Sequence, residues 1–403
     1  MFYGGAILYK LFVGIDVSKD SFVATGINGK GNISFSISDA MTSEGFSQLL
    51  KAIVSCCKGF AGVLAAMEST GCYHINLFSF LSAQDINTIV INPLLISNFA
   101  KLSLRKTKTD KKDALTIAQF LAAHKDSISQ FSIPQDIKDL RDVARERESL
   151  SHLIASVKNE IKRILQSTFP ELESICNVFT ITMLLFLKEF PSARRINSAK
   201  PKAVAHALDI AGRGRKISVS AEDIIKAAKH SVASQSLAKE LILPEKILTL
   251  THLMERLDRI TDILSGICAS VAIEELEILS SIDGISDTTG AVFLAEVGDI
   301  NNFQSHKSLI AFAGLDPAIY QSGKFQGKGK ISKRGNRHLR RIVYLMTLGV
   351  VRVNLFFKKY FLKRRKDGLP FRKAVLATAH KLIRVIFAML SHNVKFQIKE
   401  NSL

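Results

Sequence analysis

The hydrophobic pattern changes character near residue 125, and this change limits what the chain can fold into. Before that point, short apolar segments alternate with segments of helical period. Segments 9–17, 21–27 and 32–37 predict three hairpin-linked strands, because only short turns separate them. Beyond them we expect helices and strands in alternation, over residues 43–56 (helix), 62–67 (strand), 73–82 (helix), 86–91 (strand) and 110–123 (helix).

The predicted order βββαβαβα is typical of a ribonuclease-H-like domain, a mixed sheet with helices on its faces. A doubly wound nucleotide-binding fold would need a crossover at every connection, and the first three strands lie too close together in the sequence for that. We therefore predict an α/β domain over residues 1–130.

Only helical signals follow, from Pro134 to about Glu277. One apolar stripe runs over residues 140–164, and a second, with nearly heptad spacing, over residues 247–271. Heptad spacing permits a coiled coil with a partner, and an ordinary helix hairpin within one chain explains it equally well. We predict a helical, coiled-coil linker domain over residues 131–277.

The charge of the chain is concentrated at its end. Residues 1–320 carry 34 basic and 34 acidic side chains, whereas residues 321–403 carry 21 basic and 2 acidic ones, so the whole net charge of +19 lies in the last fifth. Such a block is expected of a domain that binds a polyanion, most commonly a nucleic-acid backbone. A membrane-surface helix is the alternative, but glycines at 323, 327, 329 and 335 interrupt the block.

Several other classes of protein are disfavoured. The first residues lack the basic and small-residue features of a signal peptide, and charges interrupt the longest apolar stretches, as Arg352 does. Five cysteines without a Cys-x-x-Cys pair indicate neither a disulfide framework nor a zinc site. We predict a cytoplasmic protein with no membrane segment.

Residues 279–298 predict two helices joined by a short turn at Gly284, which resembles a helix-hairpin-helix. A glycine there lets backbone N–H groups approach a phosphate. Such contacts position nucleic acid but do not read its base sequence. Any tight helix pair also needs a turn glycine. We predict that residues 278–403 form a mostly helical, basic third domain.

Four acidic residues stand where chemistry is expected. Asp16 and Glu68 each end an apolar strand, and Asp110 and Asp113 lie on one face at the start of a helix. Each acid alone is better explained by a structural role, such as a turn or a cap, than by catalysis. In the ribonuclease-H-like order, however, the ends of the first and fourth strands meet the last helix. Four converging carboxylates would repel one another unless Mg²⁺ or Mn²⁺ lay between them, and two such ions stabilise phosphoryl transfer.

A loop over residues 314–341 combines serines with many cations. It fails the phosphate-binding P-loop pattern, because Ile331 stands where a hydroxyl is required. Ser322 and Ser332 are the candidate nucleophiles, and cations beside them would stabilise a pentavalent phosphate. Gly323 favours Ser322 by freeing the backbone, whereas Ser332 precedes a helix that begins near Asn336. Taken in isolation, Ser322 is explained by a turn.

Residues of two basic segments, together with the turn glycine, are predicted to contact nucleic acid, although a solvated charge run would explain the lysines as well. These residues are Arg105, Lys106, Lys108, Gly284, Lys324, Lys328, Lys330, Lys333, Arg334, Asn336, Arg337 and Arg340.

Taken together, these motifs resemble the DEDD transposases of the insertion sequence 110 family, which are related to the Piv invertase. Asp16, Glu68, Asp110 and Asp113 match the four acidic positions, the last two within Lys-Thr-Asp-Lys-Lys-Asp-Ala. The stretches Gly-Leu-x-Pro, Ser322-Gly and Lys-Arg-Gly-Asn-x-x-Leu-Arg match the family's C-terminal domain.

The resemblance implies a RuvC-like domain that uses Mg²⁺ (or Mn²⁺), a coiled-coil linker, and a C-terminal domain whose nucleophile is Ser322. It also implies transposition by DNA recombination through a phosphoserine intermediate, guided by a bridge RNA encoded by the mobile element. The expected partners are double-stranded DNA at the element ends and target, the guide RNA, and further copies of the chain. Two alternatives stay open: a RuvC-like DNA hydrolase in which water attacks, and a non-catalytic nucleic-acid-binding protein.

Overall fold

The computed structural model describes residues 9–57, 59–68, 73–91, 93–100, 109–125, 135–215, 217–318, 321–322, 325–326 and 330–397. The chain divides into two compact units, residues 1–132 and 133–403. Each unit is described by itself below. The division of the chain into three domains at residues 130 and 277 stays a prediction.

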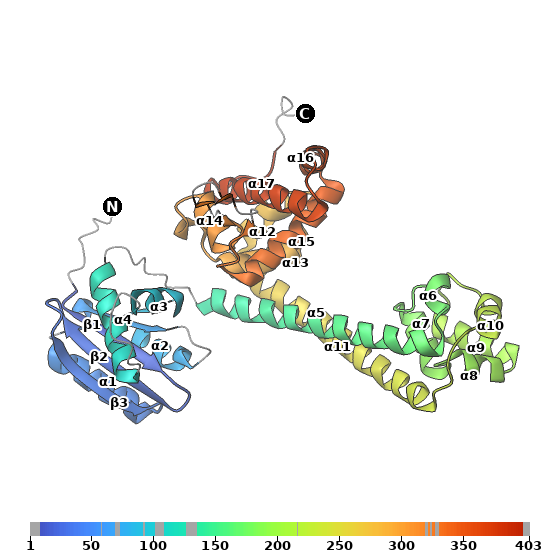
Figure 1. Ribbon diagram of the computed structural model, residues 1–403, viewed down its shortest axis with the longest axis horizontal. Coiled ribbons are helices and arrows are strands. Elements are labelled where there is room, and N and C mark those ends of the chain that lie inside the picture. The colour runs from blue at the N-terminus through green and yellow to red at the C-terminus, as the bar shows by residue number, and fades with distance from the viewer. Residues whose placement is uncertain are drawn as a thin grey trace. The chain divides into compact units, whose positions relative to one another are not determined.

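The first unit is a five-stranded mixed sheet with helices on both faces (Figure 1). The strand order is β3-β2-β1-β4-β5, with β1, β2 and β3 antiparallel and β1, β4 and β5 parallel. The strands are β1 (Leu11–Val17), β2 (Ser21–Asn28), β3 (Ile33–Ala40), β4 (Val63–Glu68) and β5 (Asn87–Ile91). The helices are α1 (Ser43–Cys56), η1 (Phe60–Gly62), α2 (His74–Ala83), α3 (Pro93–Ala100) and α4 (Asp110–His124).

Alternation along β1 divides its side chains between two cores. Val13 and Ile15 pack with α1 and α2 on one face, while Phe12 packs with α3 and α4 on the other. The predicted order of strands and helices is confirmed, with one addition. Helix α3 was not predicted, because its proline start and short length gave only a weak helical period.

The second unit begins with a pair of long helices, α5 (Gln135–Thr168) and α11 (Leu237–Val271). They run antiparallel, since Arg256 pairs with Glu146 near one end and Lys246 with Glu160 near the other. The pair lies within one chain, as the helix-hairpin interpretation predicts. Short helices pack together beyond its far end (Figure 1). They are α6 (Leu172–Ile175), α7 (Ile181–Glu189), α8 (Ala193–Ser198), α9 (Pro201–Gly212) and α10 (Ala221–Lys229).

The C-terminal helices share a core with the near end of the long pair, where Leu140, Ala144, Leu264 and Cys268 are buried. The predicted pair of helices around Gly284 is present as α12 and α13. The helices here are α12 (Ile273–Ser280), α13 (Asp287–Val297), η2 (Ile300–Asn302), α14 (His306–Phe312), α15 (Arg337–Val353), α16 (Leu355–Lys366) and α17 (Phe371–Ser391).

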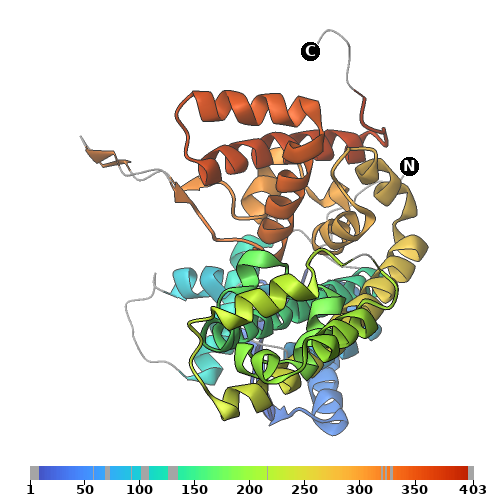
Figure 2. The same cartoon turned by 90° about the vertical axis from the view of Figure 1, so that its right-hand side faces the viewer.

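Four short strands interrupt these helices between α14 and α15. Strand β6 (Pro317–Ala318) pairs with β9 (Lys330–Ile331), and β7 (Gln321–Ser322) pairs with β8 (Phe325–Gln326). The pairs are nested, because β7 and β8 lie between β6 and β9 in the chain, and the two pairs together are called the hairpin below. Figure 2 shows β7 and β8 farther from the C-terminal helices than β6 and β9.

Within the described part of the chain, α17 alone is long and apolar enough to cross a membrane. Its apolar side is part of the protein core, since Leu382, Ile383 and Ile386 are fully buried against other helices. A core helix of a folded protein has the same length and composition, so α17 is no evidence of a membrane segment.

Candidate functional site

The two strand-end carboxylates lie on neighbouring strands. Strands β1 and β4 are parallel, with Gly14 opposite Ala66 and Ile15 opposite Met67. Continuing this register places Asp16 opposite Glu68, at the carboxyl ends of both strands. Both residues follow the alternation of the face that carries Phe12 and Leu64, which is the face covered by α4. Sequence and register therefore bring the first two predicted acids together.

Helix α4 lies unusually close to this face. A side chain at Gly14 would stand 2.1 Å from the carbonyl oxygen of Ala114 and 2.4 Å from the backbone nitrogen of Ala118. Only glycine permits such an approach of helix to strand. Gly14 is two residues from Asp16. The contact with α4 therefore lies roughly 7 Å along the strand from the end that carries Asp16.

Asp110 and Asp113 extend the buried stripe of α4 toward its start, because they precede Ala114 and Ile117 by one turn each. Thr109 caps the helix by accepting a hydrogen bond from the backbone N–H of Lys112. Acidic residues in the first turn also favour the helix dipole. Asp113 is half-buried and Asp110 is exposed.

The structure does not assemble these acids into a finished metal site. No three His, Cys, Asp or Glu side chains of the described residues lie in positions to hold one metal ion. The shared site of all four carboxylates stays a prediction. Three predicted nucleic-acid contacts beside them, Arg105, Lys106 and Lys108, lie outside the described residues.

The predicted nucleophile lies in the hairpin of the second unit. Ser322 is in β7, and its backbone is opposite Phe325 of β8, so only Gly323 and Lys324 separate the paired residues. Ser322 therefore belongs to the inner strand pair, whereas β6 and β9 form the outer pair next to the helices in the chain.

The second candidate, Ser332, has a structural partner. Its hydroxyl donates to Oδ1 of Asp316 and accepts a hydrogen bond from the backbone N–H of Arg334. The backbone N–H of Ser332 also donates to the carbonyl of Asp316, at 2.8 Å. These bonds join the two ends of the hairpin, and they occupy the hydroxyl that a nucleophile would need.

Two glycines let the motif segments pack backbone to backbone. Gly314 has a φ of +64°, and a side chain on it would stand 2.9 Å from the backbone nitrogen of Gly335. A side chain on Gly335 would stand 2.3 Å from the carbonyl oxygen of Phe312. The Gly-Leu-x-Pro and Lys-Arg-Gly-Asn segments are thus one structural element, closed by glycine contacts.

Asn336 joins this element to the rest of the unit. Its side-chain oxygen caps α15 by accepting from the backbone N–H groups of His338 and Leu339, and its nitrogen donates to Glu296 at 2.6 Å. Glu296 is 1% exposed and also accepts two hydrogen bonds from Arg145 of α5. The side chain of Asn336 is therefore engaged within the protein, which gives the motif asparagine a positioning role.

The environment of Glu296 favours its charged form. Burial alone would raise the pKa of this carboxyl, but hydrogen bonds from Arg145 and Asn336 and the charge of Arg141 outweigh burial and hold the pKa below its usual range. Sequence reasoning did not single out Glu296. The available signal was an acidic residue inside the apolar segment 291–297, where an unpaired charge would be costly.

The structure describes the side chains of only some of the cationic residues that are predicted to contact nucleic acid. Lys333, Arg334 and Arg337 are exposed, whereas Arg340 is half-buried and donates to the carbonyl of Ala313. Lys324 and Lys328 lie outside the described residues, and only the backbone of Lys330 is described.

Gly284 has a packing role besides the predicted one. Its φ is +99°, and a side chain there would stand 2.7 Å from the backbone carbonyl of Gly349 in α15. The turn between α12 and α13 therefore needs glycine to fit against α15. A phosphate contact by Gly284 stays a prediction.

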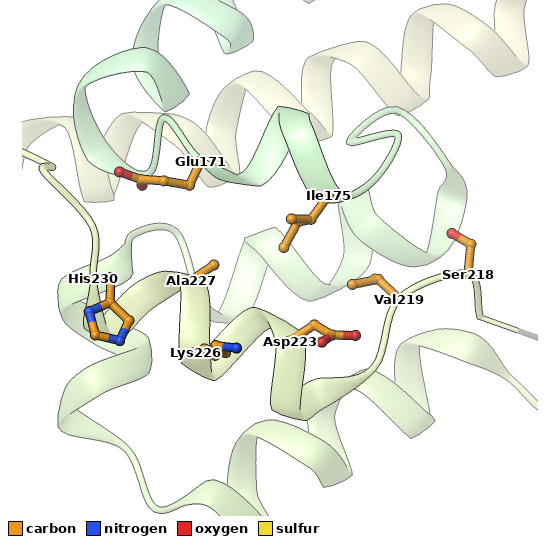
Figure 3. Close-up of a pocket in the computed structure, with 8 residues that line it drawn as sticks. All are labelled: Glu171, Ile175, Ser218, Val219, Asp223, Lys226, Ala227 and His230. Atoms are coloured by element: carbon orange, nitrogen blue, oxygen red, sulfur yellow. The ribbon is translucent and has the colours of Figure 1, made fainter.

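A separate pocket of about 490 Å³ lies among the short helices beyond the long pair (Figure 3). Glu171 and Asp223 are among its lining residues, but Glu171 accepts a hydrogen bond from the backbone N–H of Val232 and Asp223 from the hydroxyl of Ser220. Since both carboxylates already have structural partners and no predicted site residue lines this pocket, we assign it no chemistry.

Comparison with known proteins shows the family of the chain. Residues 13–170 match the DEDD transposases of the IS110 group, and residues 276–362 match the transposase family IS116/IS110/IS902. The chain belongs to the insertion sequence 110 family of transposases.

Relatives of this transposase span nearly its whole length. The 44.8 kDa protein of insertion element IS116 from Streptomyces clavuligerus is 25% identical over 94% of each chain. The pilin gene-inverting protein of Moraxella bovis is 24% identical over 96% of this chain and 98% of its own. A transposase of insertion sequence IS1111A from Coxiella burnetii is 30% identical over 36% of this chain and 42% of its own. The predicted family and the prediction of a DNA transposase are confirmed.

Proposed function

We propose that this transposase cuts and rejoins DNA by metal-assisted attack of Ser322 on a phosphodiester. The observation that carries the proposal is the β1–β4 register, which, continued by one residue, brings Asp16 opposite Glu68 on the sheet face covered by α4, the helix whose first turn holds Asp110 and Asp113. Proteins of a ribonuclease-H-like, RuvC-like fold place carboxylates at this edge, and the order β3-β2-β1-β4-β5 is compatible with that fold.

The donor chemistry fits a hard divalent cation. All four side chains offer carboxylate oxygens, which suit Mg²⁺ or Mn²⁺ and not the softer metals that prefer nitrogen or sulfur. When bound, such ions stabilise both the attacking and the leaving oxygen of a phosphoryl transfer. Asp16 and Glu68, on the rigid sheet, would position the ions, and Asp110 and Asp113 would complete the set from α4.

The attack itself is assigned to Ser322. Its Oγ forms a bond to phosphorus while the bond from phosphorus to one deoxyribose oxygen breaks, and the serine proton ends on that leaving oxygen. The product is a phosphoserine linking protein to one DNA end. A new DNA hydroxyl then attacks the same phosphorus and releases the serine. These two steps require the acidic edge and the hairpin to act on the same DNA strand. The acidic edge and the hairpin can come from one protein chain or from two.

A covalent adduct distinguishes the proposal from its alternatives. We would incubate the purified protein with end-labelled element DNA and Mg²⁺, denature it, and look for labelled protein. Ser322→Ala should lose the adduct, while the control Ser332→Ala should keep it, because the Ser332 hydroxyl is bonded to Asp316. Cleaved DNA without an adduct would favour a hydrolase in which water attacks. Binding without cleavage by the wild-type protein would favour the non-catalytic alternative.

We also propose that the element supplies a guide RNA, as the family resemblance implies. The test is to purify the protein from cells that carry the element and sequence the bound RNA. We expect one defined RNA encoded beside the gene. Recombination by preparations that contain no RNA would contradict guidance while leaving the serine chemistry in place. The cytoplasmic location stays a prediction.

A homo-oligomer is proposed on the basis of the long helix pair. Two helices alone leave apolar side chains uncovered, and Leu153 of α5 and Ile263 of α11 are each 49% exposed. A second copy would cover such positions, as the near-heptad spacing permits. Light scattering of the purified protein should report a mass at least twice that of one chain. A monomer at micromolar concentration would contradict this.

A further inference from the structure

A second cationic feature lies between α16 and α17, within the basic block 321–403 but apart from the individual residues predicted to contact nucleic acid. It is a pocket of about 550 Å³. Basic and aromatic side chains dominate its lining, which consists of Tyr360, Arg364, Leu369, Ala377, His380, Lys381 and Arg384. Helical spacing explains the grouping, since positions 377, 381 and 384 share one face of α17 and positions 360 and 364 share one face of α16.

Two cations of this pocket lie against aromatic rings. The Lys381 ammonium lies 3.6 Å from the ring centre of Phe356 and 4.7 Å from that of Tyr360, and the Arg364 guanidinium lies 5.0 Å from the Tyr360 ring. Burial and the neighbouring charge of Arg384 lower the pKa of Lys381. Lys381 and Arg364 are thus half-buried and packed against rings, whereas Arg384 is exposed.

Negative charge is scarce around them. Residues 321–403 contain two acidic side chains, Asp367 and Glu400. Asp367 pairs with Arg364 at 3.2 Å, and within the described part of the chain neither Lys381 nor Arg384 has an ion-pair partner. The Nε of Arg364 is buried without a hydrogen-bond acceptor. Grouped cations and an unsatisfied buried donor call for an anion.

The pocket is joined to the base of the hairpin that carries Ser322. The Nε2 of His380 donates to the carbonyl of Leu315, at 2.9 Å. Leu315 belongs to the Gly-Leu-x-Pro segment, immediately before β6 begins at Pro317. An anion held between α16 and α17 would therefore lie beside the segment from which the hairpin rises.

We propose that this pocket binds one backbone phosphate of a nucleic-acid strand, with Arg364, Lys381 and Arg384 as its cationic contacts. This inference rests on the proposed function, because it places a strand of the substrate beside the hairpin. A phosphate is favoured over a base, since Arg364 and Lys381 already lie against the ring of Tyr360. The phosphate is a positioning contact and takes no part in bond exchange.

The test compares two pairs of charge removals on the same helix. Lys381→Gln with Arg384→Gln removes two pocket charges, while Arg372→Gln with Lys373→Gln removes two exposed charges that do not line the pocket. Binding to a duplex of about 20 base pairs is measured by fluorescence anisotropy over a salt series. EDTA is present, so strand cleavage does not contribute.

For the pocket variant we expect about three- to tenfold weaker binding and a salt slope smaller by roughly 1, the value for one lost phosphate contact. The control variant should change both much less. Equal losses in the two variants, or none in the pocket variant, would overturn the proposal. If the double pocket variant does not fold, Arg384→Gln alone provides the same comparison, because Arg384 is exposed.

A local measurement keeps this inference separable from the chemistry. Acetylation of lysines is measured by mass spectrometry with and without the duplex. DNA should protect Lys381 and leave Lys373 reactive. Unprotected Lys381 under saturating DNA would overturn the pocket even if the Ser322 adduct forms. Protection of Lys381 in a protein that never forms an adduct would support the pocket and contradict the proposed chemistry. A wild-type protein that binds no DNA would overturn both.

Discussion

The acidic edge of the first unit and the serine-bearing loop of the second are built in different ways. Asp16 and Glu68 are placed by strand register and α4 by a glycine contact, so short segments of regular structure determine their positions. The loop is instead held at its base by residues far apart in the sequence. Asn336 and Arg145 both bind Glu296, and Ser332 binds Asp316.

This difference suits the two tasks that we propose for these regions. Carboxylates that hold metal ions require rigid spacing, which a sheet provides. A serine that attacks a DNA phosphate and is later released from it needs a loop that is held firmly at its base. The buried Glu296 holds the base of the loop, because separating a buried charge from its partners costs much free energy. The predictions below remove one support at a time.

The largest effect is expected from Asp16→Asn. The substitution keeps the shape of the side chain and removes a metal-binding charge, so strand cleavage should fall by roughly 1,000-fold or more. Nucleic-acid binding should stay near wild type, since the basic residues 321–403 are unchanged. The control is Asp20→Asn, an exposed acid in the turn after β1. Cleavage by Asp16→Asn at a rate close to that of the control would remove Asp16 from the site.

The contrast also explains what the sequence could predict. The order of strands and helices along the chain follows from local periodicity, and α1 begins and ends at the predicted residues, Ser43 and Cys56. The approach of Asp16 to Glu68 follows from the ribonuclease-H-like order that these elements predict. The partnership of Glu296 with Arg145 spans 151 positions, and no local pattern encodes it. The same holds for the nested strands at Ser322, whose two-residue segments are too short to give a period.

Arg145→Met tests the base of the loop. Glu296 would lose both hydrogen bonds from Arg145 while staying buried, so the free energy of unfolding of the second unit should fall by about 3 kcal/mol. This value is the low end for a broken buried pair, because Asn336 still donates to Glu296. Urea unfolding followed by circular dichroism measures the loss. Arg195→Met is the control, since Arg194 still binds Glu240 there and a loss of at most about 1 kcal/mol is expected.

The same variant has a pH signature. In the folded protein the pKa of Glu296 lies below its ordinary value. The charged carboxylate therefore stabilises the fold above about pH 4.3, and this stabilisation is lost as the pH falls through the pKa of the folded protein. The stability difference between wild type and Arg145→Met should therefore narrow when unfolding is measured below about pH 4. A difference that is constant from neutral to acidic pH would show that the lost stability comes from packing.

Gly14→Ala tests the support of the acidic edge without touching an acid. The new methyl group would meet the backbone of α4, which cannot give way as a flexible side chain can. We expect a loss of about 1–3 kcal/mol in the first unit and weaker cleavage, because α4 carries two of the carboxylates. Gly29→Ala is the control, as nothing lies within 4 Å of a side chain there. Equal stability of the two variants would contradict the close contact.

The smallest effect is expected from Ser332→Ala, at the joint between the two ends of the hairpin. Removing its hydroxyl leaves Asp316 without one hydrogen bond and the exposed backbone N–H of Arg334 without its acceptor, which costs about 0.5–1.5 kcal/mol. The backbone bond from Ser332 to Asp316 remains, so the hairpin should still form. A double-mutant cycle with Asp316→Ala isolates the pair. The double variant should lose less than the sum of the two single losses, because both variants break the bond between the Ser332 hydroxyl and Asp316. Additive losses would mean that the hydroxyl stabilises the loop through another partner, and loss of the DNA adduct in Ser332→Ala would reassign the nucleophile.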